Sequence, residues 1–413
     1  MQGLSEIERR ALEPVDARGA DMLANVESWS RINSGSRNMA GLAEMADLLA
    51  AAFAPLGGTA ELRDPAPVET IDEDGRRVPL AHGRNLHISR PGRGNARVML
   101  TGHMDTVFPK DHHFQDLKWL EDGVLNGPGV ADMKGGIAVM LEALRALEAS
   151  DLGGRLGWEV VLNADEEVSS LGSALLLAEV AQRCQTGLTF EPSADPEGTL
   201  AGGRKGSGNF AASIAGRAAH AGRNPEDGRN ALVAAADLAV RLDAMKTKRP
   251  TLSVNPAKID GGGPNNVVPE MAVLRWNVRP LTPDDQAWAE AAQEEILAEV
   301  AARHDVKIDV TGSFARPPKP LDEKQRGLFD LVKGCGSDLG LNIGWKDTGG
   351  VCDGNNLAAA GLAVVDTMGV RGGAIHSDRE FMIVDSLTER AKLAALTLMR
   401  LAEGRLIEGR SAQ

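Results

Sequence analysis

The sequence contains no tyrosine and only three cysteines among its 413 residues. Without tyrosine, no phenol is present to serve as an acid, a base or a nucleophile. The cysteines, Cys184, Cys335 and Cys352, are far apart, odd in number and outside any Cys-x-x-Cys pair. This pattern excludes a disulfide framework and a cysteine zinc site, and it is typical of proteins from a reducing compartment.

Long apolar runs and a positive net charge are also missing. No stretch approaches the roughly 20 apolar residues of a membrane span, and the charged N-terminal segment contains no apolar core of a signal peptide. The net charge of −13 argues against a general nucleic-acid binder. We therefore expect a cytoplasmic protein with no membrane or nucleic-acid partner. Small anionic substrates remain possible, because their binding depends on the electrostatic field at the binding site and not on the net charge of the protein.

Hydrophobic residues (43%) and charged residues (25%) occur in the proportions of an ordinary globular protein. Strand and helix patterns alternate in the first half of the chain. We expect strands at 85–90, 98–100, 158–163 and 187–190, and helices at 20–31, 39–54, 137–149 and 173–183. This alternation predicts an α/β fold, with a mixed, mostly parallel sheet sandwiched by helices.

The pattern changes in the middle of the chain. The expected elements are a strand at 209–215, a helix at 229–245, strands at 252–260 and 270–278, a helix at 283–303 and a strand at 306–311. The order βαββαβ is that of a ferredoxin-like α+β unit. Its second helix has a clear start, with Thr282 as N-cap and Pro283 at the first helical position.

The last part of the chain returns to the first pattern. Helices are expected at 324–339 and 386–403, around a strand at 362–368. The proline-rich segment from Arg316 to Pro320 is expected to form the returning linker. The chain is thus predicted to be one α/β domain, residues 1–205 and 316–413, split by an inserted domain of residues 206–315.

His103 and Asp105 directly follow the apolar run at 98–100 and the pair Thr101-Gly102. If the strand ends there, both lie at its carboxyl end, where open α/β sheets place their ligands. Side chains two residues apart in an extended chain point the same way. The imidazole can then bind a metal ion while the carboxylate orients the ring. Taken alone, the pair also fits an ordinary strand end.

Further polar residues stand at predicted strand ends or in adjoining loops. They are Asp132, the pair Glu166-Glu167, Glu191 and His376. With His103, they form the donor set of a two-metal hydrolytic site, because zinc accepts imidazole nitrogen and carboxylate oxygen together. Asp132 is the best candidate for a bridging ligand, since it precedes a helix and a carboxylate offers two oxygens.

The adjacent acids Glu166 and Glu167 point to opposite sides if the chain is extended. One of them can bind metal while the other moves a proton between water and a leaving amine. An acidic pair is also common in a solvated turn. Cys352 is a possible nucleophile, but a small buried residue is the simpler interpretation, because its local motif contains no histidine.

Taken together, the segments GHMDTVF, GPGVADMKGG, NADEEVSS, FEPS and IHSD resemble the motifs of the M20 family of metallopeptidases. The resemblance is to its glutamate carboxypeptidases and related amidohydrolases in particular. The segments follow one another between residues 102 and 378, with the inserted domain between the fourth and the fifth. The resemblance implies a fold of the di-zinc exopeptidase type.

The resemblance also implies a role for each motif residue. His103 would bind one zinc ion and His376 the other, Asp132 would bridge them, and Glu167 and Glu191 would each complete one metal site. Glu166 would be the general base, and Asp105 would orient His103. A cis peptide is expected between Asp132 and Met133. The same donors also accept Co²⁺ or Mn²⁺.

In the resembling family, the inserted domain forms the dimer interface, which implies a homodimer through residues 206–315. His220 would reach across the dimer and hydrogen-bond the oxyanion of the tetrahedral intermediate, although it also fits an ordinary loop histidine. Asn266 and Arg279 match positions that bind a substrate carboxylate, and Arg316 is a further candidate. An arginine suits a carboxylate because it forms two parallel hydrogen bonds.

The implied activity is that of a di-zinc carboxypeptidase or amidohydrolase. It would cleave an amide bond next to a free carboxylate by attack of metal-activated water, on an N-acyl amino acid, a C-terminal glutamate or a dipeptide-like compound. Two alternatives stay open, an aminoacylase or aminopeptidase of the same family and a non-catalytic ligand-binding homologue. Cys352 stands where many relatives carry Ser or Thr, which leaves the shape of the substrate open.

Overall fold

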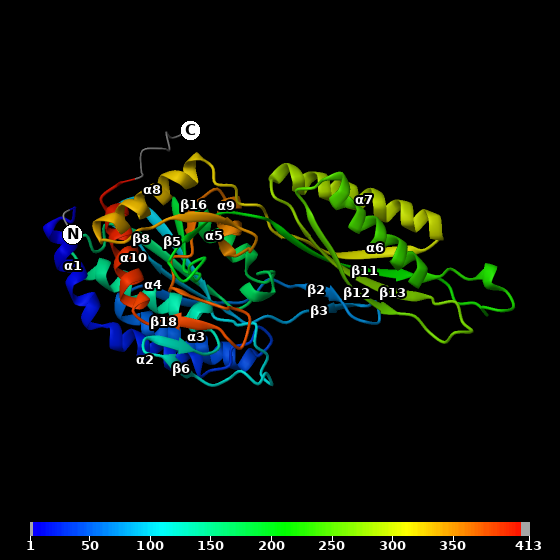
Figure 1. Cartoon of the computed structure of the whole chain (residues 1–413), viewed down its shortest axis with the longest axis horizontal. Coiled ribbons are helices and arrows are strands. Elements are labelled where there is room, and N and C mark those ends of the chain that lie inside the picture. Colours follow the sequence, from blue (N-terminus) through cyan, green and yellow to red (C-terminus); the bar gives the residue numbers. More distant parts are fainter. Residues whose placement is uncertain (1–2, 406–413) are drawn as a thin grey trace. The chain divides into compact units, whose positions relative to one another are not determined.

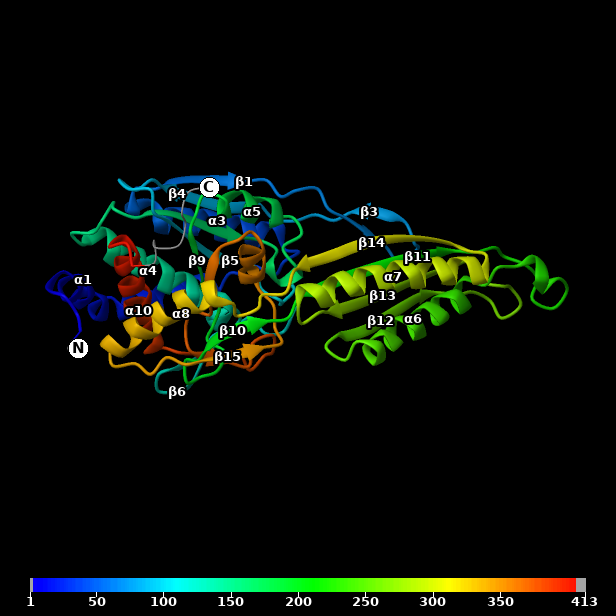
Figure 2. The same cartoon turned by 90° about the horizontal axis from the view of Figure 1, so that it is seen from above.

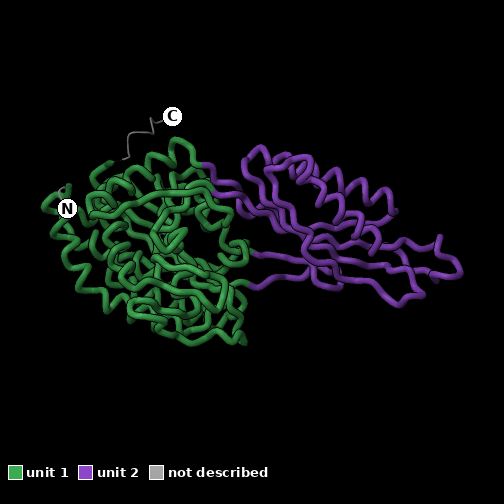
Figure 3. The backbone as a smooth tube through the Cα atoms, in the orientation of Figure 1, with its two compact units in different colours: residues 1–66, 82–203, 321–413 green, residues 67–81, 204–320 purple. Residues whose placement is uncertain are grey.

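The computed structural model describes residues 3–405, and the chain divides into two compact units (Figure 3). Unit 1 consists of Met1–Ala66, His82–Gly203 and Leu321–Gln413, and unit 2 consists of Pro67–Ala81 and Arg204–Pro320. The main segment of unit 2 is a few residues longer at each end than the predicted insertion of 206–315. The chain passes between the units four times.

Unit 1 is built on an eight-stranded mixed sheet (Figures 1 and 2). Its strands lie in the order β1 (Thr59–Arg63), β4 (Asn85–Arg90), β8 (Gly157–Asn163), β5 (Arg97–His103), β9 (Thr186–Thr189), β16 (Ala363–Asp366), β10 (Leu200–Arg204) and β15 (Trp345–Thr348). The central strands β8, β5, β9 and β16 are parallel, whereas β1, β4 and β10 pair antiparallel. The predicted mixed sheet is confirmed, with its parallel strands at the centre.

Helices cover both faces of this sheet. The α-helices in the described part of unit 1 are α1 (Glu6–Ala17), α2 (Gly19–Ser30), α3 (Met39–Phe53), α4 (Gly136–Ala149), α5 (Ala174–Ala181), α8 (Glu323–Asp338), α9 (Asp353–Ala359) and α10 (Ser386–Ala402). Along β5, Val98 and Leu100 join the main core with α3, α4, α8 and α10, while Met99 joins a second cluster with α5 and α9. Burial on both faces explains why the central strands are continuous apolar runs in the sequence.

A small four-stranded antiparallel sheet in unit 1 adjoins the two segments that carry His376 and Asp132. Its strands lie in the order β17 (Gly372–Gly373), β18 (Phe381–Ile383), β7 (Val124–Asn126) and β6 (Lys118–Glu121). The loop between β17 and β18 contains His376, and Asp132 lies between β7 and α4, in a kinked segment where its own backbone is not helical. The sequence pattern predicts none of these strands, because each has four residues or fewer and no clear periodicity.

Unit 2 contains the predicted ferredoxin-like order of elements. These are β11 (Ser207–Ala215), α6 (Ala231–Lys248), β12 (Ser253–Gly261), β13 (Met271–Arg279), α7 (Pro283–His304) and β14 (Lys307–Arg316), with the antiparallel sheet order β12-β13-β11-β14. Thr282 caps α7 as predicted. Its hydroxyl accepts a hydrogen bond from the amide of Asp285, and the Asp285 carboxylate accepts one from the amide of Thr282.

One hairpin of unit 2 corrects the predicted domain organisation. The strands β2 (Glu69–Ile71) and β3 (Arg77–Pro79) fall within the segment predicted as the first part of the α/β domain, yet they belong to unit 2. Ile71 is 1% exposed and packs with Ala211 and Val273 of the sheet. The two strands are short and polar, so only this tertiary contact assigns them to unit 2.

Among residues 3–405, one helix is long and apolar enough to cross a membrane, by length and composition alone. The 18 residues Met39–Leu56, which are α3 and the turn after it, have a mean hydropathy of 1.4. The segment is not a continuous apolar run, because it contains Glu44 and Asp47. Leu42, Met45 and Leu49 of the same segment are buried in the main core of unit 1, so α3 packs as a core helix.

Replacing Ile71 by Ala should loosen the hairpin of β2 and β3 from the four-stranded sheet of unit 2. Removal of a buried isoleucine side chain typically costs about 2–5 kcal/mol, so we expect faster backbone hydrogen exchange in β2, β3 and β11. Mass spectrometry of peptides from the intact protein measures this exchange. Leu281→Ala is the control, because Leu281 is 44% exposed in the same unit. Unchanged exchange in the Ile71 variant would contradict the packing of the hairpin on the sheet.

Candidate metal centre

The parallel strands β8, β5 and β9 bring polar residues to one edge of the sheet of unit 1. β5 ends at His103, which lies opposite Asn163, the last residue of β8. Glu166 and Glu167 follow β8 in a short 3₁₀ turn, and Glu191 follows β9. Because the carboxyl ends of neighbouring parallel strands share one edge, these side chains gather although they are distant in the sequence.

Asp132 belongs to both of two groups of potential metal ligands. Its Oδ1 lies 3.1 Å from Nε2 of His103, and its Oδ2 lies 3.2 Å from Nε2 of His376. Glu191 Oε1 lies 3.8 Å from His103 Nε2, and Glu167 Oε2 lies 3.1 Å from His376 Nε2. The first group is therefore His103, Asp132 and Glu191, and the second group is Asp132, Glu167 and His376. Within each group the potential ligand atoms lie within 4.8 Å of one another.

The centre is buried except at one ligand. The side chain of His376 is 53% exposed, whereas those of His103, Asp132, Glu167 and Glu191 are 11% exposed or less. His376 also has a left-handed backbone, with a φ of 63°. The centre thus opens to solvent on the side of His376.

The loop that carries Asp132 leads directly into α4. The peptide bond between Asp132 and Met133 is cis, as the family resemblance implies. Gly136, the first residue of α4, lies so close to the end of β9 that a Cβ atom there would come within 1.9 Å of the carbonyl oxygen of Phe190. Glycine at this position therefore allows α4 to begin beside the sheet edge that holds the centre.

Asp105 contacts the main chain of both adjacent acids. Its carboxylate accepts hydrogen bonds from the amides of Glu166 (3.1 Å) and Glu167 (3.2 Å). It also accepts one from the hydroxyl of Ser36 (2.7 Å). The Nδ1 atom of His103 lies 2.9 Å from the carbonyl oxygen of Asp105 but 3.5 Å from its carboxylate. The closer contact of the ring is thus with the main chain, whereas the sequence pattern predicts the carboxylate.

Both imidazoles of the centre have raised pKa values. Burial alone would lower the pKa of His103, but the carboxylates of Asp105, Asp132 and Glu191 around the ring raise it well above the ordinary value. Hydrogen bonds with Asp132 and Glu167 raise the pKa of His376 to about 11. Binding of a divalent cation at this place would therefore displace protons from both rings.

The carboxylates of the centre differ from one another in acidity. Burial raises the pKa of Glu167 to about 7, and the nearby Asp132 adds to the effect. Burial also acts to raise the pKa of Asp132, but His103 and His376 outweigh it and hold that pKa below its usual range. Asp132, the member that both groups share, is therefore a stronger acid than Glu167.

Two charged residues near Asp132 are buried, Lys134 within the segment GPGVADMKGG and Glu380 shortly after the segment IHSD. Glu380 is 1% exposed and accepts hydrogen bonds from three main-chain amides between Gly129 and Asp132. Lys134 is also 1% exposed, and its Nζ donates to two carbonyl oxygens at and just beyond the end of α2. Burial raises the pKa of Glu380 to about 8 and lowers that of Lys134 to about 7. Charged residues are mostly exposed, so the sequence does not predict that these two side chains are buried.

A buried polar network supports the turn that follows β8. The side-chain amide of Asn163 donates to one carboxylate oxygen of Asp353 (2.8 Å), and the hydroxyl of Ser170 donates to the other (2.6 Å). Ser170 has a left-handed backbone, with a φ of 51°. Because Asp353 is the first residue of α9, the network joins the turn with the two adjacent acids to the start of that helix. The sequence pattern does not single out Asp353.

Cys352 is the N-cap of α9 in this structure. Its Sγ accepts a hydrogen bond from the amide of Gly354 (3.3 Å) and lies 3.6 Å from a carboxylate oxygen of Asp366. The side chain of Asn355 accepts a hydrogen bond from the amide of Cys352, which completes a capping box. Cys352 is 2% exposed, which supports the interpretation as a small buried residue over that as a nucleophile.

The remaining predicted site residues all lie in unit 2. His220 and Asn266 are near one another there, since His220 forms a β-bridge with Val267, the residue after Asn266. Arg279 is the last residue of β13, and Arg316 is the last residue of β14 and 1% exposed. Their roles in binding and catalysis stay predictions.

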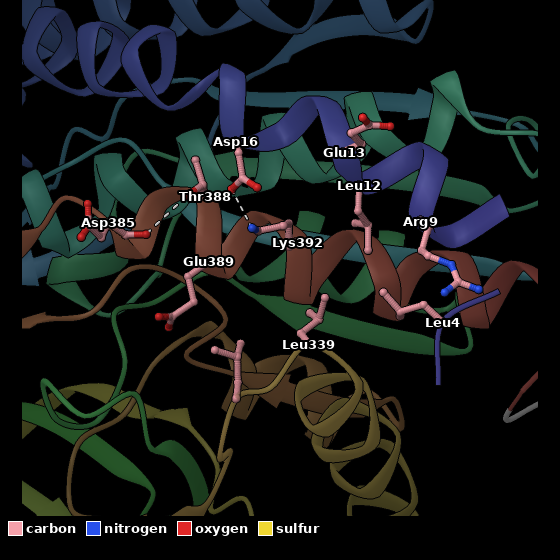
Figure 4. Close-up of a pocket in the computed structure, with 11 residues that line it drawn as sticks. Leu4, Arg9, Leu12, Glu13, Asp16, Leu339, Asp385, Thr388, Glu389 and Lys392 are labelled. Atoms are coloured by element: carbon pink, nitrogen blue, oxygen red, sulfur yellow. Dashed lines mark hydrogen bonds and ion pairs between the residues drawn. The ribbon is translucent and has the colours of Figure 1, made fainter. Parts of the chain in front are cut away.

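A hollow of about 580 Å³ lies between α1, α10 and the segment after α8 (Figure 4). Leu4, Leu12 and Leu339 give it an apolar part, and charged residues such as Glu13 and Lys392 also line it. Its lining includes no residue of the first or the second group. The hollow is therefore separate from the candidate metal centre.

Comparison with known proteins defines the class as metal-dependent hydrolases that act on amide bonds. The sequence matches the family described as peptidase family M20/M25/M40 over residues 99–400. The chain belongs to this family, which confirms the resemblance carried by the five motif segments.

Relatives in sequence and structure agree with this assignment. Carboxypeptidase G2 of Pseudomonas sp. (strain RS-16) is 31% identical over 93% of this chain and 90% of its own. Succinyl-diaminopimelate desuccinylase of Maricaulis maris (strain MCS10) is 30% identical over 78% of this chain and 85% of its own. The crystal structure of aminopeptidase PepT from Bacillus cereus has a TM-score of 0.71 at 22% identity, over 93% of this chain and 99% of its own. That of the M20 family metallo-carboxypeptidase Sso-CP2 from Sulfolobus solfataricus has a TM-score of 0.69 at 14% identity, over 92% and 99%. These likenesses confirm the predicted fold class.

Asp105→Ala should leave the amides of Glu166 and Glu167 without their acceptor. We expect the affinity for metal to fall by about 10–100-fold, as is typical when a group that orients a ligand is lost. Competition with a chelator measures this affinity. Asp64→Ala is the control, because Asp64 is 84% exposed in an ion pair of the same unit. Unchanged affinity in the Asp105 variant would mean that the turn is held without this carboxylate.

Proposed function

We propose that this protein is a homodimeric di-zinc amide hydrolase that cleaves an amide bond next to a free carboxylate. The substrate would be an N-acyl amino acid, a C-terminal glutamate or a dipeptide-like compound. The observation that carries the proposal is Asp132, which presents one oxygen to each of two groups that contain a histidine and a further glutamate. Relatives named as a carboxypeptidase, a desuccinylase and a deacetylase support this class of reaction.

The chemistry of both groups suits zinc. Each group offers one imidazole and two carboxylates, which zinc accepts together, and two ions about 3.5–4 Å apart need a shared ligand such as Asp132. We assign one ion to His103, Asp132 and Glu191, and the other to Asp132, Glu167 and His376. Co²⁺ and Mn²⁺ accept the same donors. When bound, a pair of divalent ions polarises the amide carbonyl and lowers the pKa of water at the site.

Glu166 is the proposed general base. It precedes Glu167 in the chain but belongs to neither group, and Asp105 holds the main-chain amides of both residues. Its carboxylate would take a proton from the attacking water and pass it to the leaving amine. The two adjacent acids would thus divide ligand binding and proton transfer between them.

Residues of unit 2 are the proposed contacts for the substrate. We assign the substrate carboxylate to Asn266 and Arg279, with Arg316 as a further candidate, because a guanidinium forms two parallel hydrogen bonds with a carboxylate. His220 is assigned to the oxyanion of the tetrahedral intermediate. The 31% identity to carboxypeptidase G2 favours a substrate with a free carboxylate. The likeness to an aminopeptidase at 22% identity concerns the fold alone.

Unit 2 has a surface suited to a homodimer. β12 is an edge strand, and in the described part of the chain it pairs only with β13. Val233 and Val240 of the neighbouring α6 are 51% and 70% exposed, and Ile259 of β12 is 41% exposed. An open strand edge beside exposed apolar side chains favours pairing with another chain. We therefore propose that two copies associate here and that His220 serves the centre of the partner.

Glu166→Gln should retain both metal ions and lose turnover. Removing a general base typically costs about 10²–10⁴-fold in rate, whereas the ligand variant Glu167→Gln should lose metal from the second group. The measurements are metal content and amine release from N-acyl amino acids and peptides with a C-terminal glutamate. Glu179→Gln is a matched control, because Glu179 has a 49% exposed side chain in the same unit.

The wild-type protein supplies the reference for this experiment. Its activity should disappear with a chelator and return with Zn²⁺. Preferred cleavage of peptides that have a free amino terminus would favour the aminopeptidase alternative and overturn the proposed specificity. Loss of metal from the Glu166 variant, with metal retained in the Glu167 variant, would reverse the two assignments.

Mixing two inactive variants tests whether His220 acts across the dimer. His220→Ala should lower kcat by about 10²–10³-fold, the usual cost of one oxyanion donor, without loss of metal. A mixed dimer with Glu166→Gln would contain one intact centre, because the His220 variant supplies Glu166 and its partner supplies His220. An equal mixture should therefore recover about a quarter of wild-type activity if subunits exchange freely. No recovery, with mixed dimers present, would place His220 in its own subunit's site.

A further inference from the structure

Glu380 joins the two loops that carry Asp132 and His376. It lies four residues after His376, directly before β18, and is buried. Its Oε1 accepts hydrogen bonds from the amides of Ala131 and Asp132, both at 3.0 Å, and its Oε2 accepts one from the amide of Gly129 at 3.2 Å. Because three main-chain amides donate to this one carboxylate, they fix the course of the loop at Asp132, the residue that both groups share.

The main chain of Glu380 contacts both loops as well. Its amide donates to the carbonyl oxygen of Ser377 (3.1 Å), which closes the turn after His376. Its carbonyl oxygen accepts hydrogen bonds from the side chain of Asn126 (2.7 Å) and from the amide of Gly127 (3.4 Å). One residue therefore connects the histidine of the second group to the loop of the shared aspartate.

The two groups depend on this connection unequally. His103 belongs to the central strand β5, its side chain is 1% exposed, and the carbonyl oxygen of Asp105 contacts its Nδ1. His376 lies in a loop, with a left-handed backbone and a half-exposed side chain. A shift of one loop against the other would displace His376 from Asp132 but would leave His103 on its strand.

We propose, on the basis of the two-metal function, that Glu380 is a positioning residue that sets the geometry of the second group and thereby the occupancy of the second metal position. Through its hydrogen bonds it acts on Asp132 and His376 without itself being a ligand. Its loss should therefore weaken the ion held by the second group more than the ion held by the first.

Three replacements of Glu380 separate the reach of the side chain from its charge. Glu380→Gln cannot ionise but keeps the length and the oxygen that accepts from Ala131 and Asp132, and it loses only the acceptor for the amide of Gly129. Glu380→Asp keeps the charge, but its shorter side chain does not reach these amides. If Glu380 acts by position, the Asp variant resembles Glu380→Ala, and the Gln variant, which keeps two of the three amide contacts, stays closer to the wild type. If it attracts metal by charge, the order is reversed.

Stepwise affinities for Zn²⁺, titrated against a competing chelator, provide the measurement. In the Asp and Ala variants we expect the second ion to bind about 10–100-fold more weakly. The titration should then resemble that of His376→Ala and differ from that of His103→Ala. Glu8→Gln is the matched control, because Glu8 is also 1% exposed in unit 1 and accepts hydrogen bonds from Ser5 and Arg400. It should leave both affinities unchanged.

Hydrogen exchange of the metal-free protein gives a second readout. Peptides that cover residues 124–135 should exchange faster in the Asp and Ala variants than in the wild type, and should be unaffected in the Glu8 control. If the wild type binds fewer than two ions, the proposed function fails, and hydrogen exchange alone decides the role of Glu380. If the Ala variant does not fold, the comparison of the Asp and Gln variants is sufficient.

Three results would overturn the positioning role. They are wild-type affinities and exchange rates in the Asp variant, equal weakening of both ions in that variant, and a Gln variant that binds the second ion more weakly than the Asp variant. The expected pattern combines loss of the second ion with faster exchange of the Asp132 loop.

Discussion

The candidate centre depends on one carboxylate that two imidazoles share. Asp132 faces His103 with one oxygen and His376 with the other. His103 comes from the central parallel sheet, whereas His376 comes from a loop of the small antiparallel sheet. A metal centre of this kind functions only if its side chains are held within about 0.5 Å of the productive geometry. The start of α4 beside β9 and the buried Glu380 both serve to place the Asp132 loop between the two sheets.

The hydrogen bonds around the centre use main-chain amides to hold buried carboxylates. Asp105 accepts from the amides of Glu166 and Glu167, and Glu380 accepts from three amides of the Asp132 loop. A buried carboxylate needs such partners, because its desolvation is otherwise costly. Amides satisfy it without bringing a full positive charge.

Local chemistry explains which parts of the fold could be predicted from the sequence. β4 spans the predicted residues, and α7 begins at Pro283 behind Thr282, because strand periodicity and helix capping depend on neighbouring residues. The hairpin of β2 and β3 and the edge strand β15 are too short to leave a periodic pattern. Their pairing partners are supplied by distant parts of the chain, so their place in the fold is a tertiary property.

The sequence by itself determined which residues can serve as metal ligands and in what order they occur, because only a few side-chain types bind metal and their motifs are local. The structure alone decided that Glu191 lies with His103 and Glu167 with His376. It also decided that Cys352 caps a helix and that Glu380 is buried beside the centre. These properties depend on contacts between distant segments, since the burial of a charge is set by what packs around it and not by its neighbours in the chain.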